Sequence, residues 1–326
     1  MMQGIWLENN VLSARSDLSI PTPPPGEALL HVDLAGICAT DLEMVKGYYP
    51  FTGILGHEFV GTVVRVNSQD AASQALLGKR VVGEINASCG ACASCLAGRP
   101  THCENRSVLG ITNRHGVFAD YTTLPIKNLH LLPDDLPDEA AVFVEPLAAA
   151  LEIQEQITIH PSDQVLIIGA GRLGQLIAWT LALTGCQLQV VARRPRQKEL
   201  LQKRGVRVIT ADQIPNRKMD VVVEATGSPD GFYLARQAIR PRGTLVLKST
   251  YKGEMTVNFS AIVVDEITLV GSRCGPFKPA IDNLASGKID PSDLIETCYP
   301  LTAALDAFEM AARPGIFKVL FKPGQN

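Results

Sequence analysis

The segment that most restricts the fold lies at 164–186, where a short apolar run leads through a glycine-rich turn into a longer apolar stretch. QVLIIG (164–169) is typical of a buried strand, and GRLGQLIAWTLALTGC (171–186) is typical of the helix after it. QLQVVA (187–192) and RQKELLQKRG (196–205) repeat the strand and helix patterns. Strands that alternate with helices predict an α/β fold with a doubly wound parallel sheet.

The turn between the first strand and its helix carries the spacing G-x-G-x-x-G, with glycines at Gly169, Gly171 and Gly174. Between a buried strand and a helix, this spacing is typical of a dinucleotide site. The three glycines permit the tight turn, the approach of a pyrophosphate and close helix packing, and the helix N-terminus attracts the pyrophosphate. We therefore predict that this loop binds a cofactor, with Arg172 and Leu173 included; the alternative is a turn that binds nothing.

The end of the next strand indicates which nicotinamide cofactor binds. An NAD site usually has Asp or Glu there, which accepts hydrogen bonds from the ribose hydroxyls. This chain has Ala192 at that position, followed by Arg193 and Arg194. A 2′-phosphate would meet no carboxylate at this position, and two guanidinium groups can bind it bidentately. The pattern favours NADP(H), unless both arginines lie on a solvated edge, and we also assign Lys198 and Thr226 to the cofactor site.

A separate pattern is the run of cysteines at Cys89, Cys92, Cys95 and Cys103. The sequence starts without the features of a secretion signal, so we expect a cytoplasmic protein whose thiols stay reduced. The last spacing does not fit the bacterial iron–sulfur run, which has a shorter final gap followed by Pro. Four thiolates at this spacing predict a closed tetrahedral zinc site, which stabilises a lobe and does not catalyse.

Three further residues could form a second metal site. Cys38 lies in the segment CATD, His57 in GHEFVG and Glu145 in VEPL. Taken alone, Cys38 fits a buried thiol, His57 a core histidine, and Glu145 an acid in the first turn of a helix. Together they offer a thiolate, an imidazole and a carboxylate. Such a set can hold zinc with one position open, where the metal acts as a Lewis acid on a substrate oxygen.

In this order the motifs resemble the zinc-dependent medium-chain dehydrogenase/reductase (alcohol dehydrogenase) family. The resemblance covers nearly the whole chain and rests on CATD (38–41), GHEFVG (56–61), CGACASCLAGRPTHC (89–103), GVFADY (116–121), VEPLAAAL (144–151) and GAGRLG (169–174). It implies a Rossmann domain, a mostly-β GroES-like catalytic domain and a cleft between them. The short segment from Cys103 to Glu145 is similar to the sorbitol and threonine dehydrogenase branch.

The resemblance also implies roles for single residues. It makes Cys38, His57 and Glu145 ligands of a catalytic zinc, with Glu58 as a neighbouring or exchanging ligand, so that the two glutamates compete. Thr40 corresponds to the hydroxyl that passes the substrate proton outward. Relatives often have His where this chain has Glu43, so either Glu43 or water completes the relay. A glutamate base near neutrality would need burial to raise its pKa.

The distribution of patterns divides the 326 residues into two domains. Short apolar runs separated by Gly and Pro, such as FVGTVVRV (59–66), predict strands up to a change near 144. The predicted GroES-like domain spans 1–146 and 273–326, because the last segment falls outside the strand–helix alternation, and its zinc lobe lies at about 86–106. The predicted Rossmann domain spans 147–272.

Charge and hydropathy exclude several classes of partner. The net charge is −3, with one basic stretch near the two arginines, so nucleic acid is not an expected partner. No run approaches about 18 uninterrupted apolar residues, so no membrane span is predicted. The expected partner is a small alcohol or carbonyl substrate. The family resemblance implies a homodimer or homotetramer, paired through the strand at 267–275.

The leading hypothesis is an NADP(H)-dependent oxidoreductase with two zinc ions per chain, acting on a polyol, another secondary alcohol or the matching carbonyl compound. One alternative is a zinc-free quinone or enone reductase, but such relatives lack both metal motifs. Another is a non-catalytic NADPH-binding or redox-sensing protein, which would have lost the open metal site. Four aromatic residues are candidates either for the substrate pocket or for core packing: Tyr48, Tyr49, Phe51 and Phe118.

Overall fold

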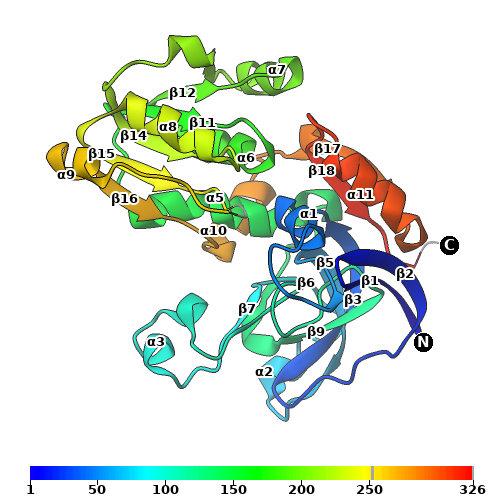
Figure 1. The fold of residues 1–326 in the computed structure, drawn as a ribbon. Coiled ribbons are helices and arrows are strands. Elements are labelled where there is room, and N and C mark those ends of the chain that lie inside the picture. The colour runs from blue at the N-terminus through cyan, green and yellow to red at the C-terminus, as the bar shows by residue number, and fades with distance from the viewer. Residues whose placement is uncertain (251–252, 325–326) are drawn as a thin grey trace. The chain divides into compact units, whose positions relative to one another are not determined.

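The computed structural model describes residues 1–250 and 253–324 and divides the chain into two compact units (Figure 1). Unit 1 comprises Met1–Glu145 with Phe277–Asn326, and unit 2 comprises Pro146–Pro276. Within the described ranges, no helix has both the length and the apolar character needed to cross a membrane.

Unit 2 is built on a parallel sheet with the strand order β13-β12-β11-β14-β15-β16. Its strands are β11 (Gln164–Ile168), β12 (Gln187–Val191), β13 (Arg207–Ile209), β14 (Met219–Glu224), β15 (Ile239–Leu247) and β16 (Thr268–Gly271). Its helices are α5 (Val144–Gln156), which leads into the unit, α6 (Arg172–Ala182), α7 (Pro195–Lys203), α8 (Pro229–Ala238), α9 (Phe259–Val264) and the 3-10 helix at Ala211–Gln213. Strands and helices alternate, which confirms the predicted Rossmann-type sheet.

The central strand β11 explains why this sheet is parallel. Val165, Leu166, Ile167 and Ile168 are all buried. Because successive residues of a strand point to opposite faces, burial of all four requires a covering layer on both faces. Leu166 and Ile168 pack in one core cluster with Phe232 of α8. Helices connecting successive parallel strands supply such layers.

Unit 1 is mostly β, as expected for a GroES-like domain. Its main sheet has the order β10-β6-β5-β3-β18-β17, with β9 also paired to β3, and β2-β1-β4 and β7-β8 form smaller sheets. Its strands are β1 (Met2–Glu8), β2 (Val11–Leu18), β3 (Glu27–Gly36), β4 (Gly53–Ile54), β5 (Glu58–Val66), β6 (Arg80–Gly83), β7 (Asn86–Ala87), β8 (Ser107–Val108), β9 (Tyr121–Pro125), β10 (Leu129–Leu131), β17 (Ile295–Tyr299) and β18 (Lys318–Phe321).

Short helices connect these strands. They are α1 (Ala39–Val45), α2 (Ala71–Gln74), α3 (Ala93–Leu96), α4 (Asp138–Ala141), α10 (Phe277–Ala285) and α11 (Ala304–Ala312), with 3-10 helices at Pro100–His102, Ile126–Asn128, Ser292–Leu294 and Leu301–Ala303. The end of the chain completes the main sheet, because β18 runs antiparallel to β3 and parallel to β17.

An aromatic cluster ties the C-terminal segment to the core of unit 1. The ring centroid of Phe118 lies 5.1 Å from that of Phe321 in β18 and 6.0 Å from that of Phe308 in α11. All three rings are buried, and both contacts of Phe118 are edge-to-face. Such pairs add to the free energy gained by burial alone. Phe118 is therefore a core residue of this unit.

We expect Phe308→Ala to lower the free energy of unfolding by about 3–5 kcal/mol, because it removes a buried ring and leaves a cavity. Leu305 on the same helix is 62% exposed, so Leu305→Ala is the matched control and should change stability by less than about 0.5 kcal/mol. Urea unfolding followed by circular dichroism measures both. Equal losses in the two variants would contradict the assignment of Phe308 to the core.

Candidate catalytic metal and cofactor sites

Strand register brings two distant motifs of unit 1 together. Gly36, the last residue of β3, pairs with Glu58, the first residue of β5. Cys38 follows β3 by two residues, and His57 immediately precedes β5. The antiparallel pairing therefore places the CATD and GHEFVG segments side by side at one end of the sheet.

The resulting cluster contains three of the predicted metal ligands. One possible ligand atom each from Cys38, His57 and Glu58 all lie within 4.8 Å of one another. His57 and Glu58 are buried and Cys38 is half-buried. The Thr40 Oγ1 atom lies 3.7 Å from the Cys38 Sγ atom. Sulfur, nitrogen and carboxylate oxygen are the donors that zinc accepts in proteins, so these residues fit the metal that their motifs predict.

Glu145 is not part of this cluster among the described residues. It lies in the first turn of α5 and is partly buried. The geometry therefore brings Glu58, not Glu145, beside Cys38 and His57. The choice between these two glutamates as a zinc ligand stays a prediction.

Asp41 contacts two residues of the cluster, Cys38 and His57. Its Oδ2 atom accepts a 2.8 Å hydrogen bond from the Cys38 backbone N–H, and its Oδ1 atom lies 3.4 Å from His57 Nδ1. Both Oδ1 and Nδ1 are buried and have no hydrogen-bond partner within the described residues. A carboxylate beside one ring nitrogen orients a histidine so that the other nitrogen faces a metal.

The electrostatics of this cluster favour a bound cation. Burial lowers the pKa of His57, but the charges of Asp41 and then Cys38 outweigh burial and raise that pKa well above its usual value. The same negatively charged neighbours would also attract a metal cation.

Lys318 of β18 pairs with Glu58 through a buried ion pair between Nζ and Oε2. The register explains this contact, because Leu320 of β18 pairs with Gly36, which also pairs with Glu58. A Cβ atom at position 36 would lie 2.8 Å from Glu58 Oε2 and 3.2 Å from the Lys318 side chain. The missing side chain of Gly36 therefore leaves room for the ion pair.

Glu43, the predicted relay residue, lies in α1 and forms a 2.7 Å ion pair with Lys46. Its side chain is 31% exposed. The carboxylate is thus paired with a lysine and in partial contact with solvent. Its part in a proton relay stays a prediction.

The four clustered cysteines lie in a lobe between β7 and β8 (cyan in Figure 1). Their Sγ atoms are separated by 3.4 Å for Cys89 and Cys103, 3.5 Å for Cys92 and Cys95, and 3.8 Å for Cys92 and Cys103. Zinc–sulfur bonds of about 2.3 Å in a tetrahedron place the sulfurs roughly 3.8 Å apart. Backbone N–H groups of Ala91 and Cys92 lower the pKa of the Cys89 thiol to about 6, whereas burial raises the pKa of the Cys95 thiol to about 11. The lobe fits a zinc ion.

The glycine loop of unit 2 has the form that a dinucleotide site needs. A Cβ atom at Gly174 would lie 1.9 Å from the Gly169 carbonyl oxygen, so only glycine allows α6 to pack this closely. A Cβ atom at Gly171 would have no heavy atom of the described residues within 4 Å, so this side of the loop is open to a ligand. Arg172 and Leu173 form the first turn of α6 and are half-buried.

The predicted 2′-phosphate residues follow β12, the neighbour of β11. Ala192 is buried, whereas Arg193 and Arg194 are exposed at the start of α7. Lys198, in the same helix, is half-buried. Since parallel strands end at one edge of the sheet, these residues and the glycine loop share the carboxyl edge of unit 2.

Thr226 follows β14 at the same edge. Its Oγ1 atom donates a 2.6 Å hydrogen bond to the buried carboxylate of Glu224, and its backbone N–H donates a second, 2.7 Å bond. The hydroxyl proton of Thr226 is therefore engaged within the protein. Its binding to the cofactor stays a prediction.

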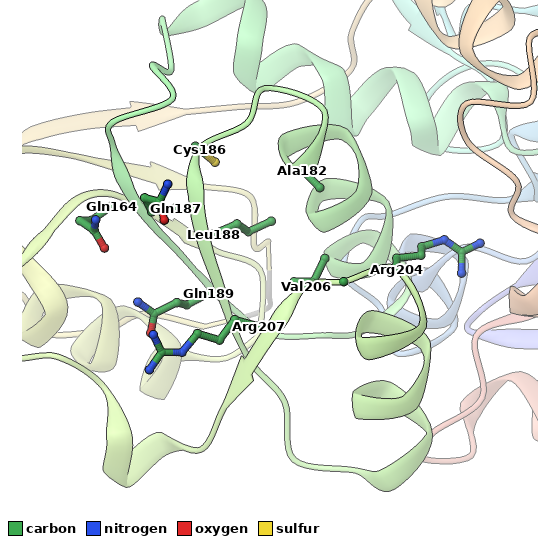
Figure 2. A pocket seen from close by; sticks show the side chains of 10 residues that line it. Gln164, Ala182, Cys186, Gln187, Leu188, Gln189, Arg204, Val206 and Arg207 are labelled. Carbon is green, nitrogen blue, oxygen red and sulfur yellow. The ribbon is translucent and has the colours of Figure 1, made fainter.

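A polar cavity of about 380 Å³ lies at the other end of these strands (Figure 2). Its lining includes Gln164, Gln187, Gln189, Arg204 and Arg207, at the amino ends of β11, β12 and β13 and after α7. Figure 2 shows the Arg204 side chain directed away from Arg207, and its guanidinium stacks 3.8 Å from the Trp179 ring centroid. The two arginines do not converge on one ligand.

Comparison with known proteins shows the family to which the chain belongs. Residues 24–134 match the family Alcohol dehydrogenase GroES-like domain, and residues 139–318 match Glucose dehydrogenase C-terminus. The sequence is 31% identical over 331 residues to D-arabinitol dehydrogenase 1 of Uromyces fabae, covering 93% of this chain and 92% of that protein. The chain belongs to the zinc-dependent medium-chain dehydrogenase/reductase family.

Among the solved structures of similar chains, one contains NADP and another contains NADH. A protein from Sinorhizobium meliloti 1021, described as a zinc-binding dehydrogenase and solved with NADP, has a TM-score of 0.89 and 29% identity over 99% of both chains. An alcohol dehydrogenase from Escherichia coli CFT073, solved with NADH, has a TM-score of 0.89 and 28% identity over 98% of this chain and 99% of its own.

Two residues of this medium-chain dehydrogenase were not identified from the sequence as part of the site. Asp41 lies three residues after Cys38, a spacing that a capping carboxylate can have, so a local signal existed. Lys318 has no such signal, because 260 residues separate it from Glu58. Of the aromatic candidates, Phe118 is a core residue, and Tyr49 is 50% exposed.

We expect Asp41→Asn to weaken zinc binding at the Cys38–His57–Glu58 cluster by about 10- to 100-fold, because an amide orients the His57 ring less firmly than a carboxylate does. Asp33→Asn is the matched control, since Asp33 also pairs with a histidine, His31, but outside the site. Titration with a chelator, followed by zinc retained per chain, measures both. An Asp41→Asn midpoint equal to that of the wild type would contradict this role.

Proposed function

We propose that this chain is a zinc-dependent, NADP-linked oxidoreductase that interconverts an alcohol and its carbonyl compound. The observation that carries the proposal is the cluster of Cys38, His57 and Glu58, whose possible ligand atoms lie within 4.8 Å of one another. An open set of three protein donors is typical of catalytic zinc, whereas the four-cysteine lobe has the closed set of a structural site.

When bound, zinc supplies a Lewis acid for the substrate oxygen, and the nicotinamide ring supplies the hydride acceptor or donor. Cys38 and His57 would hold the metal, with Glu58 or Glu145 as the further carboxylate. Thr40, whose hydroxyl lies near Cys38 Sγ, would accept the alcohol proton and pass it outward. Asp41 keeps the His57 ring in position.

The preference for NADP(H) is supported by residues of this chain. Similar structures hold NADP in one case and NADH in another, so the fold does not decide between them. Ala192 removes the acid that would accept the ribose hydroxyls of NAD, and Arg193 and Arg194 expose two guanidinium groups beside it. An open arginine pair favours a 2′-phosphate.

The substrate that we propose is a polyol or another secondary alcohol. The support is family membership together with the relative named for D-arabinitol. A suitable panel contains four- to six-carbon polyols with their matching ketoses, and simple secondary alcohols with their ketones. Oxidation of none of these with either cofactor would contradict the proposal.

The decisive experiment counts zinc and measures dehydrogenase activity in the same samples. We expect two zinc ions per chain in the wild type, one for each group of ligands. Cys38→Ser should lose one ion and nearly all activity, because it removes the thiolate of the open site. Cys95→Ser should lose the lobe ion, and Cys298→Ser, an exposed cysteine of β17, should keep both ions and full activity.

One zinc ion in the wild type, lost only in Cys95→Ser, would show that the open site holds no metal. The zinc-dependent mechanism would then be wrong, and a cofactor-binding protein without this chemistry would be favoured. Full activity in Cys38→Ser would likewise overturn the assigned role of that thiolate.

Arg194→Ala and Arg193→Ala test cofactor choice. We expect each to raise the KM for NADP⁺ by about 10- to 100-fold, the range for losing a charge-assisted hydrogen bond, with little change for NAD⁺. Arg207→Ala is the matched control, because Arg207 is exposed in unit 2 but starts β13, at the amino edge of the sheet. A similar KM increase for both cofactors would indicate general positioning and not 2′-phosphate recognition.

A further inference from the structure

The turn that carries Arg193 and Arg194 is fixed by one buried side chain, Gln197. Its Oε1 atom accepts hydrogen bonds from the backbone N–H groups of Arg193, at 3.3 Å, and Arg194, at 3.1 Å. Gln197 is the third residue of α7 and is 8% exposed. It therefore acts as a helix cap from inside the protein, directly beneath the two arginines.

Because Gln197 occupies both backbone N–H groups, these groups are not available to an anion. A phosphate at this turn would therefore be bound without these two groups, and side chains are the remaining donors next to it. The Arg193 and Arg194 side chains are exposed and able to bind it. Charge at the turn therefore becomes the main basis on which the two cofactors are discriminated.

The cap is also connected to the glycine loop. The Gln175 side chain, fully buried in α6, donates from Nε2 to the Ala170 carbonyl at 3.3 Å and to the Gln197 carbonyl at 3.2 Å. Ala170 lies between Gly169 and Gly171. One amide thus joins the loop that would hold the pyrophosphate to the turn that would hold the 2′-phosphate.

Glutamate would suit the cap position equally well for folding. Capping boxes use Glu or Gln at the third helical residue, and a negative charge there interacts favourably with the helix dipole. Yet the first turn of α7 has no acidic residue. A carboxylate at 197 would keep both N–H bonds but would place a negative charge next to a phosphate that carries close to two.

We propose that Gln197 is a specificity-determining residue, a neutral cap that lets the Arg193–Arg194 turn bind a 2′-phosphate. This inference rests on the proposed NADP preference and gives a part in it to a side chain that is neither an arginine nor a strand-end acid. It also predicts a separation of two properties: charge at 197 sets cofactor choice, whereas hydrogen bonding at 197 sets local stability.

Gln197→Glu tests the proposal without loss of the cap. The probes are adenosine 2′,5′-bisphosphate and 5′-AMP, which differ only in the 2′-phosphate, and the readout is the Kd of each by calorimetry on the full chain. We expect the Kd for the bisphosphate to rise roughly tenfold relative to that for 5′-AMP, as for one like-charge contact of about 1.4 kcal/mol. The thermal midpoint should stay unchanged or rise.

Gln202→Glu is the control, because Gln202 is an exposed residue of the same helix and its substitution adds the same charge. Its effect on the ratio of the two Kd values should be less than about twofold, since solvent and salt screen an exposed charge. Gln197→Ala should instead lower the thermal midpoint, because both N–H bonds are lost.

The outcomes separate the two levels of the proposal. If the wild type binds the bisphosphate no more tightly than 5′-AMP, the NADP preference itself is wrong. If the wild type prefers the bisphosphate and Gln197→Glu leaves that preference unchanged, only the role of Gln197 is overturned. A Gln197→Glu protein that loses affinity for both probes equally would show a merely structural residue.

Discussion

The antiparallel pairing of β3 with β5 is the constraint on which the candidate metal site depends. It sets Gly36 opposite Glu58, so the residues just beyond each strand end, Cys38 and His57, meet at one place. A slip of one residue would turn the side chains of β5 to the opposite face of the sheet. The buried residues of these strands therefore specify the site as well as the fold, since the register that fills the core also aligns the ligands.

The features of this structure that could be predicted from the sequence are those determined by residues close to one another along the chain. The strand–glycine loop–helix order at 164–186 predicted the parallel sheet, because both periodicity and turn chemistry are local. The comparison of motifs likewise indicated the family. The spacing of the cysteines predicted a lobe in which four sulfurs lie within reach of one ion, and the sulfur distances fit that prediction.

Other features could be identified only from the folded structure. Lys318 contacts Glu58 only because β18 pairs with β3 in the folded protein. The sequence near either residue contains no pattern that predicts this contact. Phe118 lies close in sequence to family motifs and was a candidate for the substrate pocket, but its contacts with Phe308 and Phe321 depend on the C-terminal segment. The role of Gln197 could be predicted from the sequence only in part. Its capping spacing is local, but its meaning comes from the exposed arginines above it and the buried Gln175 below.

The negative charges of the metal cluster need to be balanced by cations. Cys38 as a thiolate, Asp41 and Glu58 would place three negative charges in a mostly buried region, which is costly unless cations compensate. Lys318 compensates one of them through Glu58, and the remaining two match a divalent ion. Lys318 is therefore needed whether Glu58 or Glu145 coordinates the zinc ion. Once Glu58 is buried at the start of β5, its charge must be balanced even if Glu145 supplies the ligand, and the ammonium group on β18 does this without occupying a coordination position.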